Sequence, residues 1–319
     1  MQIRFPYSDG IARRLLFEPV YEGANKLCIL TPHATPSMAS WLLKSYSEKG
    51  MAGIEVELII TSALDEGIDI ISYDGFKELH RNPYPNSGNI FLCSYLYQPP
   101  AFNRNYYIWL DGETPVKAFS CSYEFTQRSI LRMHNRLMNT IEESYAYGVY
   151  EEAMCHSIYC NHSEVDDLIV VHSPTLSLSN PAPEEHCVHL SLLTRDGDTG
   201  KKSGLNWGQR NNRNKNEAYI PLPRDIARTN FFPLSKQHFL VVTDDHHTLL
   251  LRVEQQNDKA ITTPASNALL GEYFRNRLGL ANGSYIRRED LLTYGRSDVT
   301  FQKIDEEQYY MDFSVKNQK

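Results

Sequence analysis

The pattern of apolar runs changes between the two halves of this chain, which predicts two parts with different folds. In the first half, Lys26–Thr31 and Gly53–Thr61 predict buried strands, and Pro36–Lys49 between them has the apolar spacing of a helix. Strands that alternate with helices predict a layered α/β domain. The same patterns predict a helix at Tyr73–Leu79, strands at Asn89–Tyr95, Tyr106–Leu110 and Lys117–Ser122, a hairpin at Asp111–Pro115, and a helix or a loop at Ser129–Ile141.

The second half has short strand-like runs separated by polar loops, with one clear helix at Asn267–Leu278. Many short strands with one or two helices predict a small β-barrel. We therefore expect domains at residues 1–172 and 188–319, joined by a linker at residues 173–187 that is rich in Pro and Ser. The predicted strands of the second half are Val188–Leu193, Ala218–Pro221, Phe239–Val242, Thr248–Val253 and Val299–Ile304.

Charge separates the two halves as well. The chain has 319 residues and a net charge of −7, but residues 1–194 hold 13 Lys and Arg against 23 Asp and Glu, whereas residues 195–319 hold 19 against 16. The acidic half would repel a phosphate backbone, and the other half carries a local positive field. No run of apolar residues is long enough to cross a membrane, and the N-terminus has no apolar signal core. The six Cys form no paired framework, so we expect reduced thiols and a cytoplasmic protein.

The local positive charge is concentrated in one polar segment. Ser203–Tyr219 reads SGLNWGQRNNRNKNEAY, and no acid occurs from Thr199 to Asn216. Arg, Lys, Asn and Gln are the side chains that contact phosphates and base edges of DNA. A flexible surface loop has a similar composition, but Trp207, flanked by Gly204 and Gly208, favours a shaped arm that contacts nucleic acid.

Several separated segments of the second half, in their order along the chain, resemble the recognition domain of the NgoFVII-type restriction endonucleases. That domain is similar to the B-three pseudobarrel domain of plant transcription factors, in which two arms grip the major groove of double-stranded DNA. The matching segments are SGLNWGQR, NEAYIPLP, FFP at Phe231–Pro233, VVTDD at Val241–Asp245, KAITT at Lys259–Thr263 and LGEYFRNRLGL at Leu270–Leu280.

The resemblance implies two DNA-binding arms, which we call the first arm (residues 201–215) and the second arm (residues 255–263). A solvated hairpin is the alternative interpretation of residues 255–259. The candidate DNA contacts are Lys201, Lys202, Asn206, Trp207, Gln209, Arg210, Asn211, Asn212, Arg213 and Lys215 in the first arm, and Gln255, Gln256, Lys259, Thr262 and Thr263 in the second.

The first half is similar to the phospholipase-D-like nuclease domain of the same family, more in layout than in motif. The family chemistry needs a His and a Lys two residues apart on one strand, where both face the same way. The His attacks phosphorus, the Lys neutralises the nonbridging oxygens, and no metal or other cofactor is needed. Tyr107 and Trp109 anchor the alignment, which places Asn103 at the His position and Asn105 at the Lys position.

A turn that carries an Asn completes the family's site, and here Glu124 occupies that position, two residues after Ser122. Asn cannot attack phosphorus, and Glu adds like charge beside a phosphate. A shift of one residue places Phe102 and Arg104 at the His and Lys positions, which is no better. We therefore expect a nuclease half that keeps its framework and has a degenerate catalytic site.

Other residues offer alternative sites. His134 and His33 are candidates for a different catalytic His, although each is interpreted more simply as a loop residue. A zinc site would use Cys155, His156, Cys160 and His162, with Cys187 and His189 near in sequence, but the order fits no common zinc finger. A metal-dependent nuclease centre would use Glu55, Glu57 and Asp65, of which Glu55 and Glu57 also fit the solvent face of an alternating strand.

Three functions follow from these observations. The first is sequence-specific binding of duplex DNA by a restriction-endonuclease-type protein, either as a homodimer through its N-terminal half or as a heteromer with an active paralogue. The second is an active restriction endonuclease with a non-standard or metal-assisted site. The third is a scaffold that does not bind DNA and docks through its acidic half.

Overall fold

The computed structural model describes residues 10–133, 136–173, 187–254 and 258–315. The chain forms two compact units, Met1–Pro174 and Thr175–Lys319. Among the described residues, no helix is both long enough and apolar enough to span a membrane.

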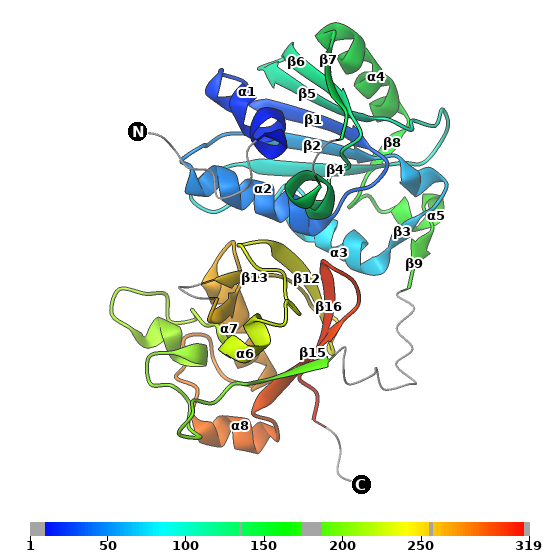
Figure 1. Cartoon of the computed structure of the whole chain (residues 1–319). Helices are drawn as coiled ribbons and strands as arrows, with labels where there is room; N and C mark the ends of the chain where they lie inside the picture. Colours follow the sequence, from blue (N-terminus) through cyan, green and yellow to red (C-terminus); the bar gives the residue numbers. More distant parts are fainter. Residues whose placement is uncertain (1–9, 134–135, 174–186, 255–257, 316–319) are drawn as a thin grey trace. The chain divides into compact units, whose positions relative to one another are not determined.

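The first unit is built on a seven-stranded mixed sheet with the order β7-β6-β5-β1-β2-β4-β8 (Figure 1). Strands β1, β2 and β4 run parallel, and β5 is antiparallel to β1 and to β6. The carboxyl ends of β1, β2 and β6 therefore meet the amino end of β5 at one edge of the sheet. The strands are β1 (Lys26–Thr31), β2 (Glu55–Ile60), β4 (Ile90–Leu96), β5 (Asn105–Asp111), β6 (Thr114–Cys121), β7 (Met138–Ile141) and β8 (Ser157–Tyr159).

Helices cover both faces of this sheet, α2 (Pro36–Glu48) and α3 (Ile70–Leu79) on one side and α4 (Glu143–Cys155) on the other (Figure 1). Helix α2 begins where the Thr35 side chain accepts a hydrogen bond from the Met38 amide, with Pro36 in the first turn, where its missing N–H costs nothing. The smaller elements are a π-helix (Arg13–Phe17), α1 (Glu18–Tyr21), a 3-10 helix (Ser62–Leu64), a π-helix (Arg128–Arg132), α5 (Val165–Leu168), and β3 (Ile68–Asp69) paired with β9 (Val171–His172).

Beneath α4, the β2 residue Glu57 belongs to a half-buried polar cluster. Its carboxylate accepts hydrogen bonds from Lys26 Nζ at 2.8 Å and from Tyr150 Oη at 2.9 Å, and its side chain is 15% exposed. Burial alone would raise the pKa of Glu57, but the hydrogen bonds from Lys26 and Tyr150 outweigh burial and hold this pKa below its ordinary value. The expectation that Glu57 lies on a solvent face is wrong, because α4 covers that face of the strand.

The second unit is built on another seven-stranded sheet, with the order β10-β15-β16-β12-β13-β14-β11. Its two edge strands, β10 and β11, lie close together, so the sheet is nearly closed into a barrel. All neighbouring strands are antiparallel except β12 and β16. The strands are β10 (Cys187–Ser191), β11 (Ile220–Pro221), β12 (His238–Thr243), β13 (Thr248–Glu254), β14 (Ala260–Thr262), β15 (Asp298–Lys303) and β16 (Gln308–Asp312).

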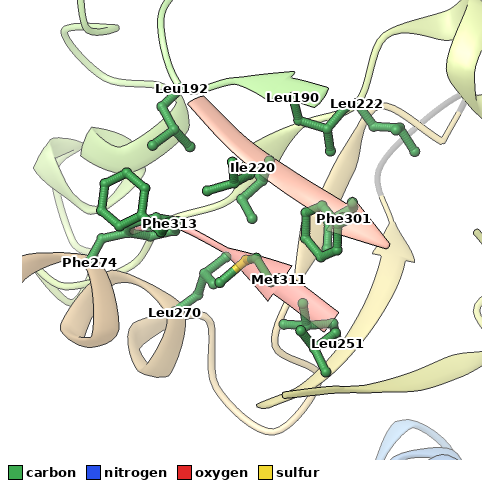
Figure 2. Packing of buried hydrophobic residues seen from close by; sticks show 14 of the residues in the cluster. Leu190, Leu192, Ile220, Leu222, Leu251, Leu270, Phe274, Phe301, Met311 and Phe313 are labelled. Atoms are coloured by element: carbon green, nitrogen blue, oxygen red, sulfur yellow. The ribbon is translucent and has the colours of Figure 1, made fainter. Parts of the chain in front are cut away.

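Helix α7 (Asn267–Arg277) contributes to the core of this unit, as do Ala227 of α6 (Arg224–Ala227) and Leu291 of α8 (Arg288–Tyr294). Leu270 and Phe274 of α7 point into a cluster of fully buried strand residues that includes Phe301 and Met311 (Figure 2). Leu270 and Phe274 are four residues apart, which places them on one face of the helix. The core therefore fixes the rotation of α7 about its own axis.

Most of the predicted strands and helices are present at their expected positions. Ser129–Ile141 is neither one helix nor one loop, because it contains part of a π-helix and then the edge strand β7. Helix α4 was not predicted, and its buried side chains are two Ala and Tyr150 among charged neighbours. The predicted linker falls almost wholly on residues 174–186, outside the described residues.

Candidate nucleic-acid interface and catalytic edge

The first arm is an ordered loop that begins with a 3-10 helix, Gly204–Gln209. Two main-chain hydrogen bonds tie the arm to the residues that follow it, from the Tyr219 amide to the Gly204 carbonyl at 3.2 Å and from the Gly208 amide to the Glu217 carbonyl at 2.7 Å. Gly208 has no room for a side chain, because a Cβ there would meet the main chain of residues 214–217. The local backbone thus specifies a folded arm.

Two polar side chains of this loop point inward and hold it in place. Asn206 is 0% exposed, donates to the Ile286 carbonyl at 2.8 Å and accepts from the Ile286 amide at 2.9 Å. Asn216 is also buried, donates to Glu272 and accepts from the Gly283 amide. Asn206, a predicted DNA contact, therefore has a structural role, because its side chain is buried and both its oxygen and its nitrogen bond to Ile286 inside the protein.

Trp207 is half-buried, and two guanidinium groups lie over its ring. The Cζ atom of Arg210 is 3.6 Å from the ring centre and that of Arg213 is 4.6 Å from it. Arg210 also donates through Nε to the Lys202 carbonyl at 2.9 Å, whereas Arg213 forms an ion pair with Glu217. The ring faces these cations, so the structure favours a platform for Arg side chains over a purely internal packing role.

The outer surface of the first arm is cationic. Gln209 is half-buried and donates to the carbonyls of Gly283 and Lys215. Lys215 is exposed, and its Nζ lies 3.3 Å from the Arg210 carbonyl. The exposed candidate contacts are Lys201, Lys202, Arg210, Asn211, Asn212, Arg213 and Lys215.

The second arm differs from its prediction. Gln255 and Gln256 lie outside the described residues, and Lys259 is exposed. Thr262 and Thr263 are 3% and 2% exposed, and their hydroxyl groups donate to Glu254 and to the Ser266 carbonyl. We do not retain these two threonines as contacts, because both side chains are buried. Thr262 is the last residue of strand β14, and Thr263 follows it directly.

The predicted catalytic positions lie at the edge where β1, β2 and β6 end and β5 begins, here called the catalytic edge. Asn105 is the first residue of β5 and is 8% exposed, whereas Asn103 precedes the strand and is exposed. Thr31 Oγ1 donates to Asn105 Oδ1 at 2.5 Å, and Asn105 Nδ2 donates to the Cys121 carbonyl at 3.2 Å. The two asparagines therefore do not form the same-face pair on one strand that the alignment predicts.

Ser122 and Glu124 follow β6 at the same edge. Ser122 is exposed, and its amide donates to the Leu137 carbonyl at 3.0 Å. Glu124 is half-buried, and its amide donates to Ser129 Oγ at 3.1 Å. None of the four positions holds the His or the Lys that the family's reaction uses, because they are Asn103, Asn105, Ser122 and Glu124.

His33 follows β1 and reaches the same edge. Its carbonyl accepts a hydrogen bond from the Phe125 amide at 3.1 Å and lies 3.1 Å from Thr31 Oγ1. Its Nδ1 lies 3.3 Å from Ser62 Oγ and 3.8 Å from a Glu66 carboxylate oxygen. Ser62 donates its hydroxyl proton to the Pro32 carbonyl at 2.6 Å, so its contact with the His33 ring is favourable when Nδ1 carries a proton.

The other candidate sites do not converge. Over the described ranges, no three His, Cys, Asp or Glu side chains come together in a geometry that would hold a metal ion. Cys155 and His162 are exposed, whereas Cys160 is buried. His134 lies outside the described residues.

Comparisons with known proteins assign both units. The family model of the NgoFVII restriction endonuclease N-terminal PLD domain, where PLD denotes phospholipase D, matches residues 9–167. The model of the NgoFVII C-terminal B3-like DNA-binding domain matches residues 182–305. No curated protein matches the sequence significantly.

Solved structures give weaker likenesses. NucT from Helicobacter pylori is 14% identical over 46% of this chain and 92% of its own, with a TM-score of 0.29. A polyphosphate kinase from Porphyromonas gingivalis is 11% identical over 48% of this chain, with a TM-score of 0.29, and the match spans only 23% of that kinase. The two family models follow each other in the order that the sequence resemblance predicts, and the chain therefore belongs to the NgoFVII restriction endonuclease family.

Proposed function

We propose that this protein binds a specific short sequence of double-stranded DNA, and that it does so with the exposed cations of the first arm. One observation carries the proposal: the B3-like unit presents an ordered loop on which Arg210 is stacked over Trp207. A stacked guanidinium keeps its five N–H donors in a fixed plane, which suits paired hydrogen bonds to guanine O6 and N7.

The exposed cations differ in how much charge they offer to DNA. In the part of the chain that the structure describes, Lys201, Lys202, Arg210 and Lys215 form no ion pair, whereas Arg213 is paired with Glu217. Lysines and arginines that neutralise phosphates release counterions and give most of the salt-dependent affinity. The acidic total charge of the chain does not oppose this, because affinity follows the local field.

We propose further that the catalytic edge does not perform the family's phosphoryl transfer. The family positions hold Asn103, Asn105, Ser122 and Glu124, and the buried amide of Asn105 is engaged by Thr31 and Cys121. A Glu in place of the family's Asn repels a phosphate. DNA cleavage then requires an active paralogue in a heteromer, whereas a homodimer formed through the N-terminal unit acts by binding alone.

The test begins with the unmodified full-length protein. Selection from a pool of random duplexes, followed by a gel shift at several salt concentrations, is expected to give one preferred short sequence. Arg210→Ala is expected to reduce the preference for that sequence. Cleavage is measured on the selected duplex in EDTA, where we expect none; cleavage that survives EDTA and requires Asn103 or Glu124 contradicts the degenerate assignment. A protein with no duplex affinity at low salt fits the scaffold hypothesis instead.

A second candidate function rests on His33. Its Nδ1 lies against Ser62 and Glu66, and it shares the catalytic edge with Asn105. A histidine with an oriented ring is a competent general base. If the protein is an active endonuclease with a non-standard site, His33→Gln abolishes plasmid cleavage in the presence of divalent ions and leaves DNA affinity unchanged. This candidate is excluded if the wild-type protein cleaves no plasmid with any of several divalent ions.

A further inference from the structure

Arg275, near the end of α7, is a fully buried arginine. Its side chain is 0% exposed, and within the described ranges it takes part in no ion pair. A buried charge is expensive unless hydrogen bonds compensate it, so the partners of this guanidinium show what it is used for.

All of its hydrogen bonds go to main-chain carbonyl oxygens. Nη2 donates to Leu205 at 3.4 Å and to Lys215 at 3.1 Å, and Nη1 donates to Asn216 at 3.4 Å. Leu205 lies at the start of the first arm and Lys215 at its end, so one nitrogen bridges both ends of the loop. The remaining bonds, from Nη1 to Gly271 at 3.0 Å and from Nε to Ser284 at 2.8 Å, tie the same group to α7 and to the loop that follows it.

The arrangement follows from the faces of α7. Leu270 and Phe274 fill the barrel core (Figure 2), so Gly271 and Arg275, each one residue later, lie together on the neighbouring face of the helix. A Cβ at Gly271 would collide with the Asn216 carbonyl and crowd the Arg275 guanidinium. Helix α7 therefore has Gly271 where the Asn216 carbonyl packs against it, and Arg275 where hydrogen bonds reach Leu205 and Lys215 of the arm.

We propose that Arg275 is the positioning residue of the first arm, and that it holds the arm in its DNA-reading shape before DNA is bound. The link to DNA rests on the proposed function, whereas the link to the shape of the arm does not. Arg275 acts through Trp207 and Arg210, which lie between the two ends that it joins. An arm built in advance has less conformational entropy to lose on binding, so its contacts appear more fully as affinity.

Lysine cannot replace this arginine. A guanidinium presents five N–H donors in a rigid fork, whereas an ammonium is a single point charge on a flexible stem. Arg275→Lys keeps the positive charge and most of the volume but cannot bridge Leu205 and Lys215 while also reaching Ser284. The variant therefore separates the geometry of the fork from its charge.

Helix α7 supplies a matched control. Arg277 lies two residues later and pairs with Asp244 and Asp245, away from the arm. Arg277→Lys weakens a comparable polar network in the same helix without touching residues 205–216. Both variants are compared with wild type by thermal unfolding, by iodide quenching of tryptophan fluorescence and by DNA affinity.

Iodide quenching reports on the arm without DNA. Trp41 and Trp109 are buried, whereas Trp207 is half-buried on the arm, so the quenchable signal comes mainly from Trp207. We expect Arg275→Lys to increase quenching and to reduce the ratio of specific to non-specific affinity by about tenfold or more, the scale of one lost base-pair contact. Arg277→Lys is expected to lower the melting temperature while changing neither readout.

The proposal is overturned if Arg275→Lys shows the same quenching and the same specificity ratio as the wild-type protein. If the wild-type protein binds no DNA but Arg275→Lys still increases quenching, the positioning role stands and only the proposed function fails. If Arg275→Lys does not fold, hydrogen exchange of the free wild-type protein decides: the Gly208 and Tyr219 amides should exchange as slowly as those of α7, and an arm that exchanges freely beside a protected α7 contradicts the proposal.

Discussion

The guanidinium carbon of Arg210 lies 3.6 Å from the centre of the Trp207 ring, and its Nε donates to the Lys202 carbonyl at 2.9 Å. The aromatic face and the carbonyl fix the plane of the guanidinium, while the residue as a whole is exposed. Arginine loses several rotatable bonds of freedom when it contacts DNA, and a side chain that is already ordered avoids part of that loss. Under the proposed function, Arg210 is therefore the cation of the arm best prepared to contact a base.

Replacement of Arg210 by Ala should weaken binding to the selected duplex more than binding to random DNA. If Arg210 pairs with a guanine, the variant loses about 1–3 kcal/mol of discrimination at that position. Fluorescence anisotropy with the selected duplex and with variants of each base pair measures this loss. Arg14→Ala, which removes an exposed cation from the N-terminal unit, is the control. Equal losses on all sequences would instead assign Arg210 to a phosphate.

Glu217 restrains the neighbouring cation, because its carboxylate forms an ion pair with Arg213. DNA must compete with this carboxylate for the Arg213 guanidinium. Glu217→Gln should therefore strengthen binding to non-specific duplex and make the dependence of affinity on salt steeper by about one phosphate contact. Titrations at four or more salt concentrations give the slope. Arg213→Ala combined with Glu217→Gln should remove the gain; if the gain persists, it has another origin.

The sequence predicted the fold well where apolar periodicity was strong. Strand β1 begins and ends at the predicted residues, and the helix predicted at Asn267–Leu278 corresponds to α7. Helix α4 was missed, because the small side chains of Ala146 and Ala153 give little periodic signal although they pack against the sheet. Edge strands such as β7 were also unclear, since half-exposed residues alternate weakly.

The candidate site was predicted in outline but not residue by residue. Composition located the first arm, yet it cannot distinguish Asn206, which is buried against Ile286, from Asn211, which is exposed. Only the tertiary contacts of the loop decide which amide faces inward. The role of Arg275 was invisible for the same reason, because an arginine near the end of a helix usually faces solvent.

Acid should destabilise the N-terminal unit through Glu57. Hydrogen bonds from Lys26 and Tyr150 hold the pKa of Glu57 below its ordinary value, despite burial, which would raise this pKa. A depressed native pKa gives stability that is present above the unfolded value of about 4.3 and is lost as the pH falls through the native pKa.

Urea unfolding between pH 7 and pH 3 measures this contribution. Glu57→Gln should lower the free energy of unfolding at pH 7 and flatten its decline below pH 5, because the variant has no carboxylate to protonate. Glu113→Gln, in the exposed hairpin, should leave the curve unchanged. A wild-type curve that is already flat between pH 5 and pH 3 would remove Glu57 from the account.

Restoration of the family residues at the two asparagines of the catalytic edge should affect stability to different extents. Asn105 is buried between Thr31 and Cys121, so Asn105→Lys breaks both hydrogen bonds and places a charge at a buried position; a loss of about 1–3 kcal/mol in unfolding free energy follows. Asn103 is exposed ahead of the strand, so Asn103→His should change stability little. Thermal unfolding of the single and double variants, with cleavage assayed in EDTA, separates the effects. A stable double variant that cleaves DNA would show that the framework at this edge still accepts the His–Lys pair, which the packing around Asn105 argues against.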